Sequence, residues 1–384
     1  MHILEIETFG RGGLTHYAYN LSRALAERGH DVTFVTTAAY ELDDLEGPPD
    51  RVRIVQAIGR RGWRGSLSRK VEAVLDAFAV ARQARRLRPD VLHLHCTNPI
   101  ALLYLSRLRK LERPLVSTAH VVTPHERIPF QDAIYRRIHR LGDLVVAHSE
   151  FDKKRLTDEF AVGPERVAVI PHGEYGFFAR GGEPVDRDEA RRGLGLGPRD
   201  ETALFFGYIR EYKGLDLLLD AWPAVVAARP AARLVVAGDP VRLRHERRVE
   251  LERRAERLGA VHRFGYVPFA DVRRYFAAAD VLVMPYRHIS QSGVLYLALA
   301  LGVPVVATRV GALPEMLEDG ASALLVPPES PGELASALVR ALGDAGLRER
   351  LADGGRRVAE AHSWPAVAEQ TERAFLQLIE DEAG

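Results

Sequence analysis

Short β-branched segments alternate with helical segments along the chain, and this pattern limits the possible folds more than any other feature. In the first half, strands are expected over residues 3–6, 32–36, 91–94, 115–118, 144–147 and 167–170, with helices over 14–28, 67–87, 100–110, 134–141 and 150–159. Ser149 and Asp152 have the spacing of a capping box at the start of the last of these helices. Strands that alternate with helices form a parallel sheet covered on both faces. The first half is therefore predicted to be an α/β domain.

A segment rich in glycine, proline and charge, from Pro171 to Asp200, interrupts the pattern. It has no sustained hydrophobic period, as expected of a domain linker. Beyond it, strands are expected over 203–206, 233–237, 281–284, 305–307 and 323–326, with helices over 214–228, up to 258, 294–301, up to 342 and over 365–379. Two similar α/β halves predict a ligand cleft at the carboxyl ends of their strands.

The composition fits a folded protein, and the near-zero net charge argues against binding of a polyanion over the whole surface. The chain has 384 residues, which favours two domains or three, and its formal net charge is +1. No apolar run has the length of a membrane span. The chain opens on a strand pattern with no signal peptide ahead of it, and its single cysteine, Cys96, excludes an intramolecular disulfide and a multi-cysteine zinc site. We therefore expect a cytoplasmic protein.

Basic residues gather in the first half of the chain. Between residues 60 and 88 the sequence contains only two acidic residues but nine basic ones: Arg60, Arg61, Arg64, Arg69, Lys70, Arg82, Arg85, Arg86 and Arg88. Further arginines follow up to Arg140. Solvated helix faces are the favoured interpretation. The alternative is a peripheral contact with anionic lipid or with an anionic acceptor, at the inner face of a membrane.

A polar loop from Arg287 to Val294 precedes an apolar helix that is expected to end at Leu301, before Gly302. A loop that opens a helix with Ser and Gly exposes unpaired backbone N–H groups at the positive end of the helix dipole, which suits phosphate oxygens. The helix carries almost no polar residue and should be buried on all sides. The alternative is that this loop only connects a strand to a helix and binds no ligand. The local sequence pattern, taken alone, favours that alternative.

Two further loops could bind a phosphate. Arg210 and Lys213 end a strand and open a helix, and two cations there suit a diphosphate whose leaving charge must be stabilised. Gly12 and Gly13 follow the first strand and let the backbone approach a ligand closely. Each has a simpler interpretation: an exposed pair of charges, and a tight turn without the third glycine of a dinucleotide fingerprint.

Histidines mark the carboxyl ends of two inner strands. His120 follows a strand, where it could hydrogen-bond a sugar hydroxyl or simply cap a loop. His93 and His95 share one face of a strand and would suit a metal. We interpret this pair as lining of the core or of the cleft.

Taken together, these motifs resemble a known family. In chain order they are Gly12-Gly13-Leu14, Thr118-Ala119-His120, Ile170-Pro171-His172-Gly173, Phe206 to Gly214, Gln291-Ser292-Gly293-Val294, Gly311-Ala312-Leu313-Pro314-Glu315 and Ser363-Trp364. Each is weak alone, but the ordered set covers essentially the whole chain. It resembles the retaining nucleotide-sugar glycosyltransferases of family 4, which have the GT-B double-Rossmann fold.

The resemblance implies three parts and a set of site residues. Residues 1–175 would form the acceptor domain, 176–362 the nucleotide-sugar donor domain, and 363–384 a helix that returns to the first domain. The catalytic residues would be His120, at the donor sugar, and Arg210 with Lys213, at the donor phosphates. The donor would be bound by Gly12, Gly13, Gln291, Ser292, Gly293, Val294 and Glu315. The family needs neither a metal nor another cofactor, and base recognition is expected from the backbone near Gly265, Tyr266 and Val267.

One departure from the family pattern concerns a pair of glutamates. Relatives carry Glu-x7-Glu across this loop and helix, whereas Gln291 stands near the first glutamate and Leu297 or Ala298 near the second. Arg210 likewise replaces an arginine that relatives carry upstream, where Tyr208 stands. The contact with the nucleotide ribose must therefore come from elsewhere. A Gln-Ser-Gly-Val variant resembles a subgroup of the family, so we interpret the change as divergence.

The predicted function is a metal-independent, retaining hexosyltransferase that uses a nucleotide-diphosphate sugar and an acceptor hydroxyl on a carbohydrate, lipid-linked or small molecule. An epimerase or phosphorylase with the same fold is one alternative, although neither an acid–base set nor a pyridoxal-phosphate lysine can be identified. The other alternative is a non-catalytic nucleotide-sugar-binding protein, which the missing glutamate favours. Nucleic acid is not an expected partner, because the basic residues have no interleaved aromatics.

Overall fold

The computed structural model describes residues 1–10, 12–40, 49–62, 66–96, 98–123, 130–175 and 185–383. Arg64 of the basic stretch and residues 176–184 of the expected linker lie outside the described residues. The chain divides into two compact units. The N-terminal unit consists of Met1–Gly173 with His362–Gly384, and the C-terminal unit consists of Glu174–Ala361.

The N-terminal unit is built on a parallel sheet in the order β3-β2-β1-β4-β5-β6-β7. The strands are β1 (His2–Ile6), β2 (Asp31–Thr37), β3 (Val52–Ile58), β4 (Val91–Cys96), β5 (Leu115–Ala119), β6 (Leu144–Ala147) and β7 (Val167–Val169). One face is covered by α2 (Ser66–Leu87), α3 (Ala101–Leu108), α4 (Gln131–Leu141) and α5 (Glu150–Asp158). The other is covered by α1 (Gly12–Glu27) and α15 (Trp364–Ala383). Both predicted features, parallel strands and two covered faces, are confirmed.

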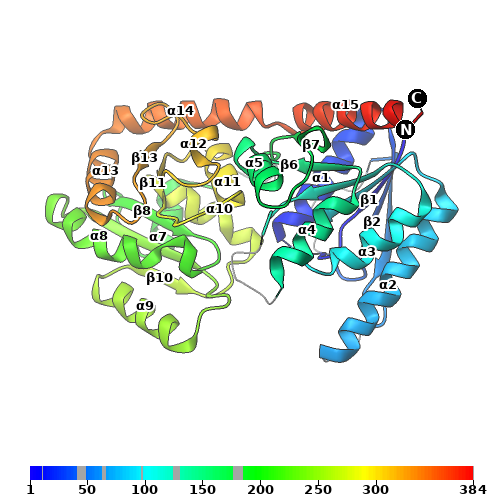
Figure 1. Ribbon diagram of the computed structural model, residues 1–384. Helices are drawn as coiled ribbons and strands as arrows, with labels where there is room; N and C mark the ends of the chain where they lie inside the picture. The colour runs from blue at the N-terminus through cyan, green and yellow to red at the C-terminus, as the bar shows by residue number, and fades with distance from the viewer. Residues whose placement is uncertain are drawn as a thin grey trace. The chain divides into compact units, whose positions relative to one another are not determined.

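The last helix belongs to the N-terminal unit, where α15 packs along α1 (Figure 1). The Glu372 carboxylate accepts hydrogen bonds from Arg28 Nε at 2.6 Å and from His30 Nε2 at 2.8 Å. Gly173 is needed where this helix begins, because a Cβ there would lie 2.5 Å from the Trp364 ring. The end of the chain is thereby held on the sheet of its first residues.

The C-terminal unit repeats this architecture with a parallel sheet in the order β10-β9-β8-β11-β12-β13. Its strands are β8 (Glu201–Phe206), β9 (Ala232–Gly238), β10 (Val261–Phe264), β11 (Val281–Met284), β12 (Val305–Thr308) and β13 (Leu324–Val326). Its helices are α7 (Arg187–Gly193), α8 (Leu215–Ala228), α9 (His245–Arg257), α10 (Phe269–Ala278), α11 (Gly293–Ala300), α12 (Leu313–Met316), α13 (Pro331–Gly343) and α14 (Ala345–Ala361). Apolar clusters cover both faces of this sheet too. Among the described residues, no helix is both long enough and apolar enough to span a membrane.

Several elements escaped the sequence prediction. The sequence prediction did not include β3 and β10, which both lie at the edge of a sheet. Polar residues interrupt the apolar pattern in each: β3 reads Val-Arg-Ile-Val-Gln-Ala-Ile and β10 reads Val-His-Arg-Phe. α10 and α14 were also missed. The expected linker from Pro171 to Asp200 is wrong in its second part, because α7 occupies it. Arg191 of that helix is buried and donates to Asp280 at 2.8 Å, which ties α7 to the C-terminal unit.

Other local predictions are confirmed. The Ser149 hydroxyl caps α5 by accepting a hydrogen bond from Asp152 N at 3.0 Å. The helix after the polar loop, α11, buries its residues from Leu295 to Leu299 on all sides, as its apolar sequence requires.

Candidate functional site

Four histidine rings surround Tyr17 of α1 in the N-terminal unit. The ring centroids of His95, His120, His148 and His172 lie 4.6–5.6 Å from that of Tyr17. The histidines come from the carboxyl ends of β4, β5 and β6 and from the segment after β7. Because these strands are neighbours in a parallel sheet, their ends meet at one edge. Tyr17 and three of the histidines are buried, while His120 is partly exposed.

Three of these rings form a continuous chain of hydrogen bonds. Glu5 Oε2 lies 2.7 Å from His95 Nε2, and His95 Nδ1 lies 3.1 Å from His120 Nε2. His120 Nδ1 lies 3.2 Å from His148 Nε2, and His148 Nδ1 lies 3.0 Å from the Ile170 carbonyl oxygen. Both ring nitrogens of His120 are therefore engaged. A hydrogen bond from His120 to a sugar would have to replace one of these links.

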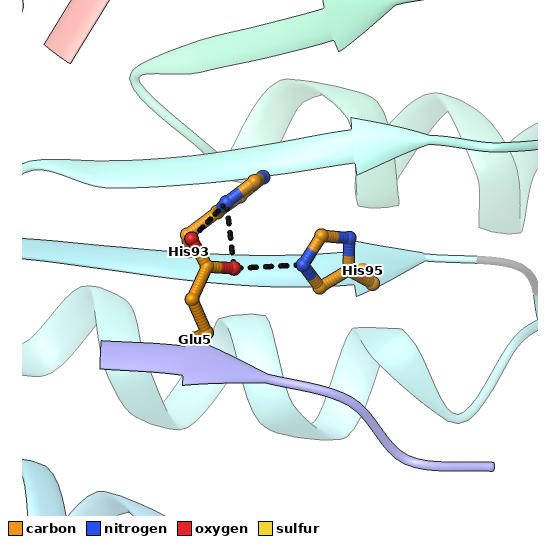
Figure 2. Close-up of side chains that lie close together, drawn as sticks. All are labelled: Glu5, His93 and His95. Carbon is orange, nitrogen blue, oxygen red and sulfur yellow. Dashed lines mark hydrogen bonds and ion pairs between the residues drawn. The ribbon is translucent and has the colours of Figure 1, made fainter. Parts of the chain in front are cut away.

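Glu5, His93 and His95 form the group of side chains that could hold a metal ion among the described residues. Figure 2 shows the Glu5 carboxylate between the two imidazoles. It lies 3.0 Å from His93 Nδ1, and His93 Nε2 lies 2.7 Å from the Thr118 hydroxyl. Every candidate ligand atom thus has a hydrogen-bond partner within the cluster. A metal would have to displace these bonds, so the arrangement fits a buried hydrogen-bonded network better than a metal centre.

Sequence reasoning missed Glu5, although it expected a lining role for His93 and His95. Glu5 comes from β1, and its backbone is paired with His93 in the sheet. The two residues are 88 positions apart in the chain. An isolated glutamate in a strand predicted to be buried on both faces was the available signal, since a buried charge needs a partner.

Burial and mutual repulsion govern the charges of this cluster. Burial, together with the charges of neighbouring imidazoles, lowers the pKa of His95 and of His148 to about 4. Burial and the charges of His148, His95 and His172 lower the pKa of His120 well below its usual value. Burial alone would raise the pKa of Glu5, but the charges of His93 and His95 and their hydrogen bonds lower it to about 2. Glu5 is therefore ionised at neutral pH.

The Gly12 and Gly13 loop follows β1 and is shaped by a second buried carboxylate. Glu7 accepts hydrogen bonds from Phe9 N, from Gly10 N at 2.8 Å and from the Thr36 hydroxyl at 3.1 Å. Burial raises the pKa of Glu7, although these hydrogen bonds oppose the rise. Gly12 has a φ of +66°, and a Cβ added there would meet nothing within 4 Å, so the space above the loop is open. Sequence reasoning found the glycines and missed Glu7.

Lys213 is the central cation of the C-terminal unit. Its side chain is 6% exposed, and its ammonium nitrogen lies 5.4 Å from the centroid of the Tyr286 ring. No carboxylate pairs with it among the described residues. Burial and the charge of Arg210 lower the pKa of Lys213 to about 7. Gly207 leaves room for it, because a Cβ there would lie 3.1 Å from the ammonium.

The loop before α11 lies beside this cation. A Cβ on Gly207 would also lie 2.9 Å from Val294 Cγ2, so the turn after β8 touches the start of α11. Ser292 caps α11 without a side-chain hydrogen bond to the helix, and the N–H groups of Gly293 and Val294 have no backbone acceptor among the described residues. A Cβ on Gly293 would collide with Tyr175, which explains the glycine.

Two buried polar atoms of this region have no hydrogen-bond partner among the described residues, Arg210 Nε and Gln291 Nε2. The Gln291 amide oxygen accepts a hydrogen bond from the Tyr296 hydroxyl at 3.0 Å, which leaves its NH₂ group as the unpaired donor. Buried donors without partners are rare, and they point to an acceptor that binds there. Both residues were singled out from the sequence.

Arg287 braces the two loops, a role that the sequence did not reveal. Its guanidinium donates to both carboxylate oxygens of Asp216, at 2.9 and 3.0 Å, and to the Glu211 carbonyl at 2.8 Å. Burial raises the pKa of Asp216, but the hydrogen bonds and charges of Arg287 and Arg247 outweigh it and lower that pKa. The brace joins the turn that carries Lys213 to the loop that carries Gln291.

The remaining predicted residues lie nearby in the chain or in the core. Glu315 is exposed in α12, and its loop approaches the polar loop so closely that a Cβ on Gly311 would lie 1.6 Å from the Ile289 oxygen. Leu297 and Ala298 are buried and present no polar group. Gly12, Gly13 and His120 belong to the N-terminal unit, and all other predicted site residues belong to the C-terminal unit.

Comparison with known proteins gives two family matches. The family model described as Glycosyltransferase Family 4 matches residues 11–173, and the one described as Glycosyl transferases group 1 matches residues 200–344. The two matches correspond to the two units.

Curated relatives cover nearly the full chain. D-inositol 3-phosphate glycosyltransferase of Geodermatophilus obscurus is 32% identical over 97% of this chain and 86% of its own length. The protein of the same name from Actinosynnema mirum is 31% identical over 95% of this chain and 92% of its own length.

Solved structures share the fold. Sucrose-phosphate synthase of Thermosynechococcus elongatus is 23% identical, with a TM-score of 0.80 and 99% of each chain covered. HepE of Anabaena in complex with UDP-glucose is 19% identical, with a TM-score of 0.76, 98% of this chain and 100% of the other covered. These likenesses confirm the predicted α/β GT-B fold.

Proposed function

This chain belongs to glycosyltransferase family 4, and we propose that it moves a hexose-type sugar from a nucleotide-diphosphate sugar to an acceptor hydroxyl, with retention of configuration and without a metal. That it is a glycosyltransferase follows from its relatives. The donor, the stereochemistry and the independence from metal are the parts that we propose.

One observation carries the donor assignment: buried, unpaired donors converge in the C-terminal unit. Lys213 has no counter-ion among the described residues, and Arg210 Nε and Gln291 Nε2 have no acceptor there. A diphosphate supplies the oxygens and the negative charge that this set lacks. The backbone N–H groups at the start of α11 add neutral donors at the same loop.

These groups suggest how the bond to the leaving group is broken. Lys213 and Arg210 stabilise the negative charge that develops on the departing diphosphate, a task for which other enzymes use a metal ion. The acceptor hydroxyl attacks from the face of the leaving group, and a departing phosphate oxygen takes its proton. In this scheme no side chain of the protein acts as a nucleophile.

His120 is proposed to contact the donor sugar. Its partial exposure makes it the accessible member of the histidine chain, and a sugar hydroxyl would replace His95 or His148 at one ring nitrogen. Gly12 and Gly13 would let the backbone approach the substrate closely. Glu315 is proposed to lie near the donor, and the nucleotide base is proposed to lie against the backbone near Gly265.

Thermal shift with nucleotide sugars tests the donor class. UDP-, ADP-, GDP- and TDP-sugars should be compared, starting with UDP-glucose because a structural neighbour binds it. At least one should raise the melting temperature of the wild type, and Lys213→Ala should abolish the shift. Lys154→Ala, an exposed lysine of the N-terminal unit, should retain it. Absence of any shift in the wild type contradicts the proposed donor.

The acceptor is proposed to be a hydroxyl of a phosphorylated polyol or sugar, since the relatives are named D-inositol 3-phosphate glycosyltransferases. Product formation with inositol phosphates and sugar phosphates, monitored by mass spectrometry, tests this class. Donor hydrolysis that is not accelerated by any of these acceptors contradicts it, and donor binding without turnover contradicts catalysis.

We also propose a peripheral contact with anionic membranes through α2. Val71, Leu75 and Phe78 of this helix are exposed at 45%, 36% and 51%, and basic side chains such as Arg85 and Arg86 share the helix. In co-sedimentation with vesicles containing phosphatidylglycerol, the wild type should be recovered in the pellet and Phe78→Ser in the supernatant. The control variant Phe151→Ser, at an exposed residue of α5, should still be recovered in the pellet. Recovery of the wild type in the supernatant contradicts the contact.

A further inference from the structure

The hydrogen-bonded histidine chain ends in an acceptor at each side. At one end stands the Glu5 carboxylate, and at the other the Ile170 carbonyl oxygen. Between them lie three imidazoles, those of His95, His120 and His148, joined by four contacts of 2.7–3.2 Å. Each contact is short enough to require one proton between its two heavy atoms.

Three neutral imidazoles supply only three protons for these four contacts. If all were neutral and Glu5 were ionised, one contact would bring two lone pairs together in a buried site. An uncompensated contact of this kind is costly, because Glu5, His95 and His148 are buried.

We propose that Glu5, His95, His120 and His148 share one additional proton at neutral pH, so that the three imidazoles together carry one positive charge paired with the Glu5 carboxylate. Each of the four contacts then has its proton. The buried cluster is electrically neutral as a whole, which is the form in which buried charges persist.

The bonds of His93 place this proton on the chain rather than on Glu5. We assign to neutral His93 the tautomer in which Nδ1–H donates to the ionised Glu5 and Nε2 accepts from the Thr118 hydroxyl. The carboxylate thereby receives two N–H donors and stays ionised, in line with its lowered pKa. Burial lowers the pKa of each of the three rings, and repulsion between the imidazoles opposes a second proton. The first proton is retained against burial because it is paired with the Glu5 carboxylate and completes the fourth hydrogen bond.

The other groups around the chain do not supply a rival charge. From α1, Tyr17 faces all three rings, and burial and the charge of Glu5 raise its pKa, so it stays neutral. From the segment after β7 comes His172, whose pKa burial and His148 lower to about 3, with His362 adding to the effect. From α15 comes the uncharged Trp364 ring, 5.2 Å from that of Tyr17. Glu7, the other buried carboxylate of this edge, is held by Gly10 N and the Thr36 hydroxyl.

The shared proton gives His120 a partly cationic ring at the accessible end of a buried network. Glu5, His95 and His148 are then positioning residues, which set the charge and orientation of His120. Their effect on a donor sugar or phosphate rests on the function proposed above, whereas the protonation state of the chain does not.

Glu5→Gln is a sharp test because it offers the chain a different end. The amide oxygen can accept from His93, and the amide NH₂ can donate to His95 Nε2. The three imidazoles then need no additional proton. Because a carboxylate and a compensating proton are removed together, the net charge of the cluster does not change.

Nitrogen NMR of the full-length protein labelled on histidine provides the measurement. At pH 7.5 the wild type should show one imidazolium, localised on or averaged over the three rings, and Glu5→Gln should show none. His139 is the internal reference, because it is equally buried in the same unit, bonds the Val122 oxygen and should stay neutral in both. As a second readout, the pH profile of donor hydrolysis in Glu5→Gln should lose the limb that the chain contributes, with a rate about tenfold below wild type near neutrality.

Three neutral rings in the wild type overturn the proposal, and this spectrum decides the matter even if Glu5→Gln does not fold. An imidazolium that persists in folded Glu5→Gln overturns the link to Glu5. If the spectra agree with the proposal but neither protein hydrolyses a donor, the proposed function fails while the shared proton stands.

Discussion

The histidine cluster of the N-terminal unit and the loops around Lys213 in the C-terminal unit treat their buried polar groups in opposite ways. In the N-terminal unit, Glu5 and the histidines around Tyr17 satisfy one another. In the C-terminal unit, among the described residues, Lys213 has no carboxylate partner, and Arg210 Nε and Gln291 Nε2 have no acceptor. Both units have the same architecture, so the contrast comes from the side chains at the strand ends and not from the fold.

The contrast separates two kinds of preorganisation. A network that is complete in itself holds its members in place before any ligand arrives, and it resists change because each lost partner leaves a buried group unpaired. Buried donors without an acceptor destabilise the free protein, and a ligand that accepts their hydrogen bonds removes this destabilisation. The expected consequence is that the C-terminal unit supplies most of the donor affinity, while the N-terminal unit mainly orients.

Replacement of Lys213 is the strongest way to break this comparison. Lys213→Ala should lower donor turnover by about 10²–10³-fold, because it removes a buried charge that faces the leaving diphosphate. Steady-state kinetics with the donor identified by thermal shift provides the measurement. Lys213→Met, which keeps the apolar stem, should lose as much activity and melt no earlier than the wild type, since its burial costs no charge. Near-normal turnover of either variant would show that Lys213 does not serve the reaction.

Replacement of His120 should have a smaller effect on the reaction. His120→Asn is expected to lower turnover by about tenfold to 10²-fold, because an orienting contact is lost while the cations of the other unit remain. Nucleotide affinity, measured by calorimetry, should change little. A loss of nucleotide affinity as large as that of Lys213→Ala would remove the distinction between the two units.

The pH dependence of nucleotide binding sharpens the assignment of Lys213. Burial and Arg210 lower its pKa to about 7, and a bound diphosphate must raise that pKa again. Binding therefore takes up a proton, and affinity should fall by up to about tenfold per pH unit above pH 7. Calorimetry in buffers of different ionisation enthalpy measures the uptake. Lys213→Met is the control and should show none; equal uptake in both proteins would assign the proton to another group.

The smallest expected effect concerns the brace between the loops. Arg287→Lys keeps the charge but loses the bidentate contact with Asp216, and should cost about 1–2 kcal/mol of stability. Chemical denaturation gives the free energy of unfolding. Arg309→Lys, whose guanidinium pairs with Asp319 on the surface, is the matched control and should change it by far less. Equal losses of unfolding free energy in the two variants would show that the contact between Arg287 and Asp216 stabilises the protein no more than a surface ion pair does.

Particular residues show how far sequence reasoning reached. The strand and helix pattern predicted the two parallel sheets, and the apolar run from Leu295 to Leu299 predicted a helix buried on all sides. The motifs pointed to Lys213, which is buried, and to Arg210 and Gln291, each of which has a buried nitrogen without an acceptor among the described residues. Edge strands such as β10 were missed because half-exposed strands need no apolar pattern. α7 was missed because its anchor is an ion pair between Arg191 and Asp280, far apart in the chain.

The sequence by itself determined the alternation of strands and helices, the glycines at the turns and the kinds of side chain at the strand ends, because these follow from local periodicity and backbone sterics. Only the tertiary structure decided which of those side chains meet. The pairing of Glu5 with His93 and His95, the chain through His120 to Ile170, and the brace from Arg287 to Asp216 all join residues that are far apart in sequence. Parallel strands bring such residues to one edge of a sheet, and burial there makes the charge of each group depend on its partners.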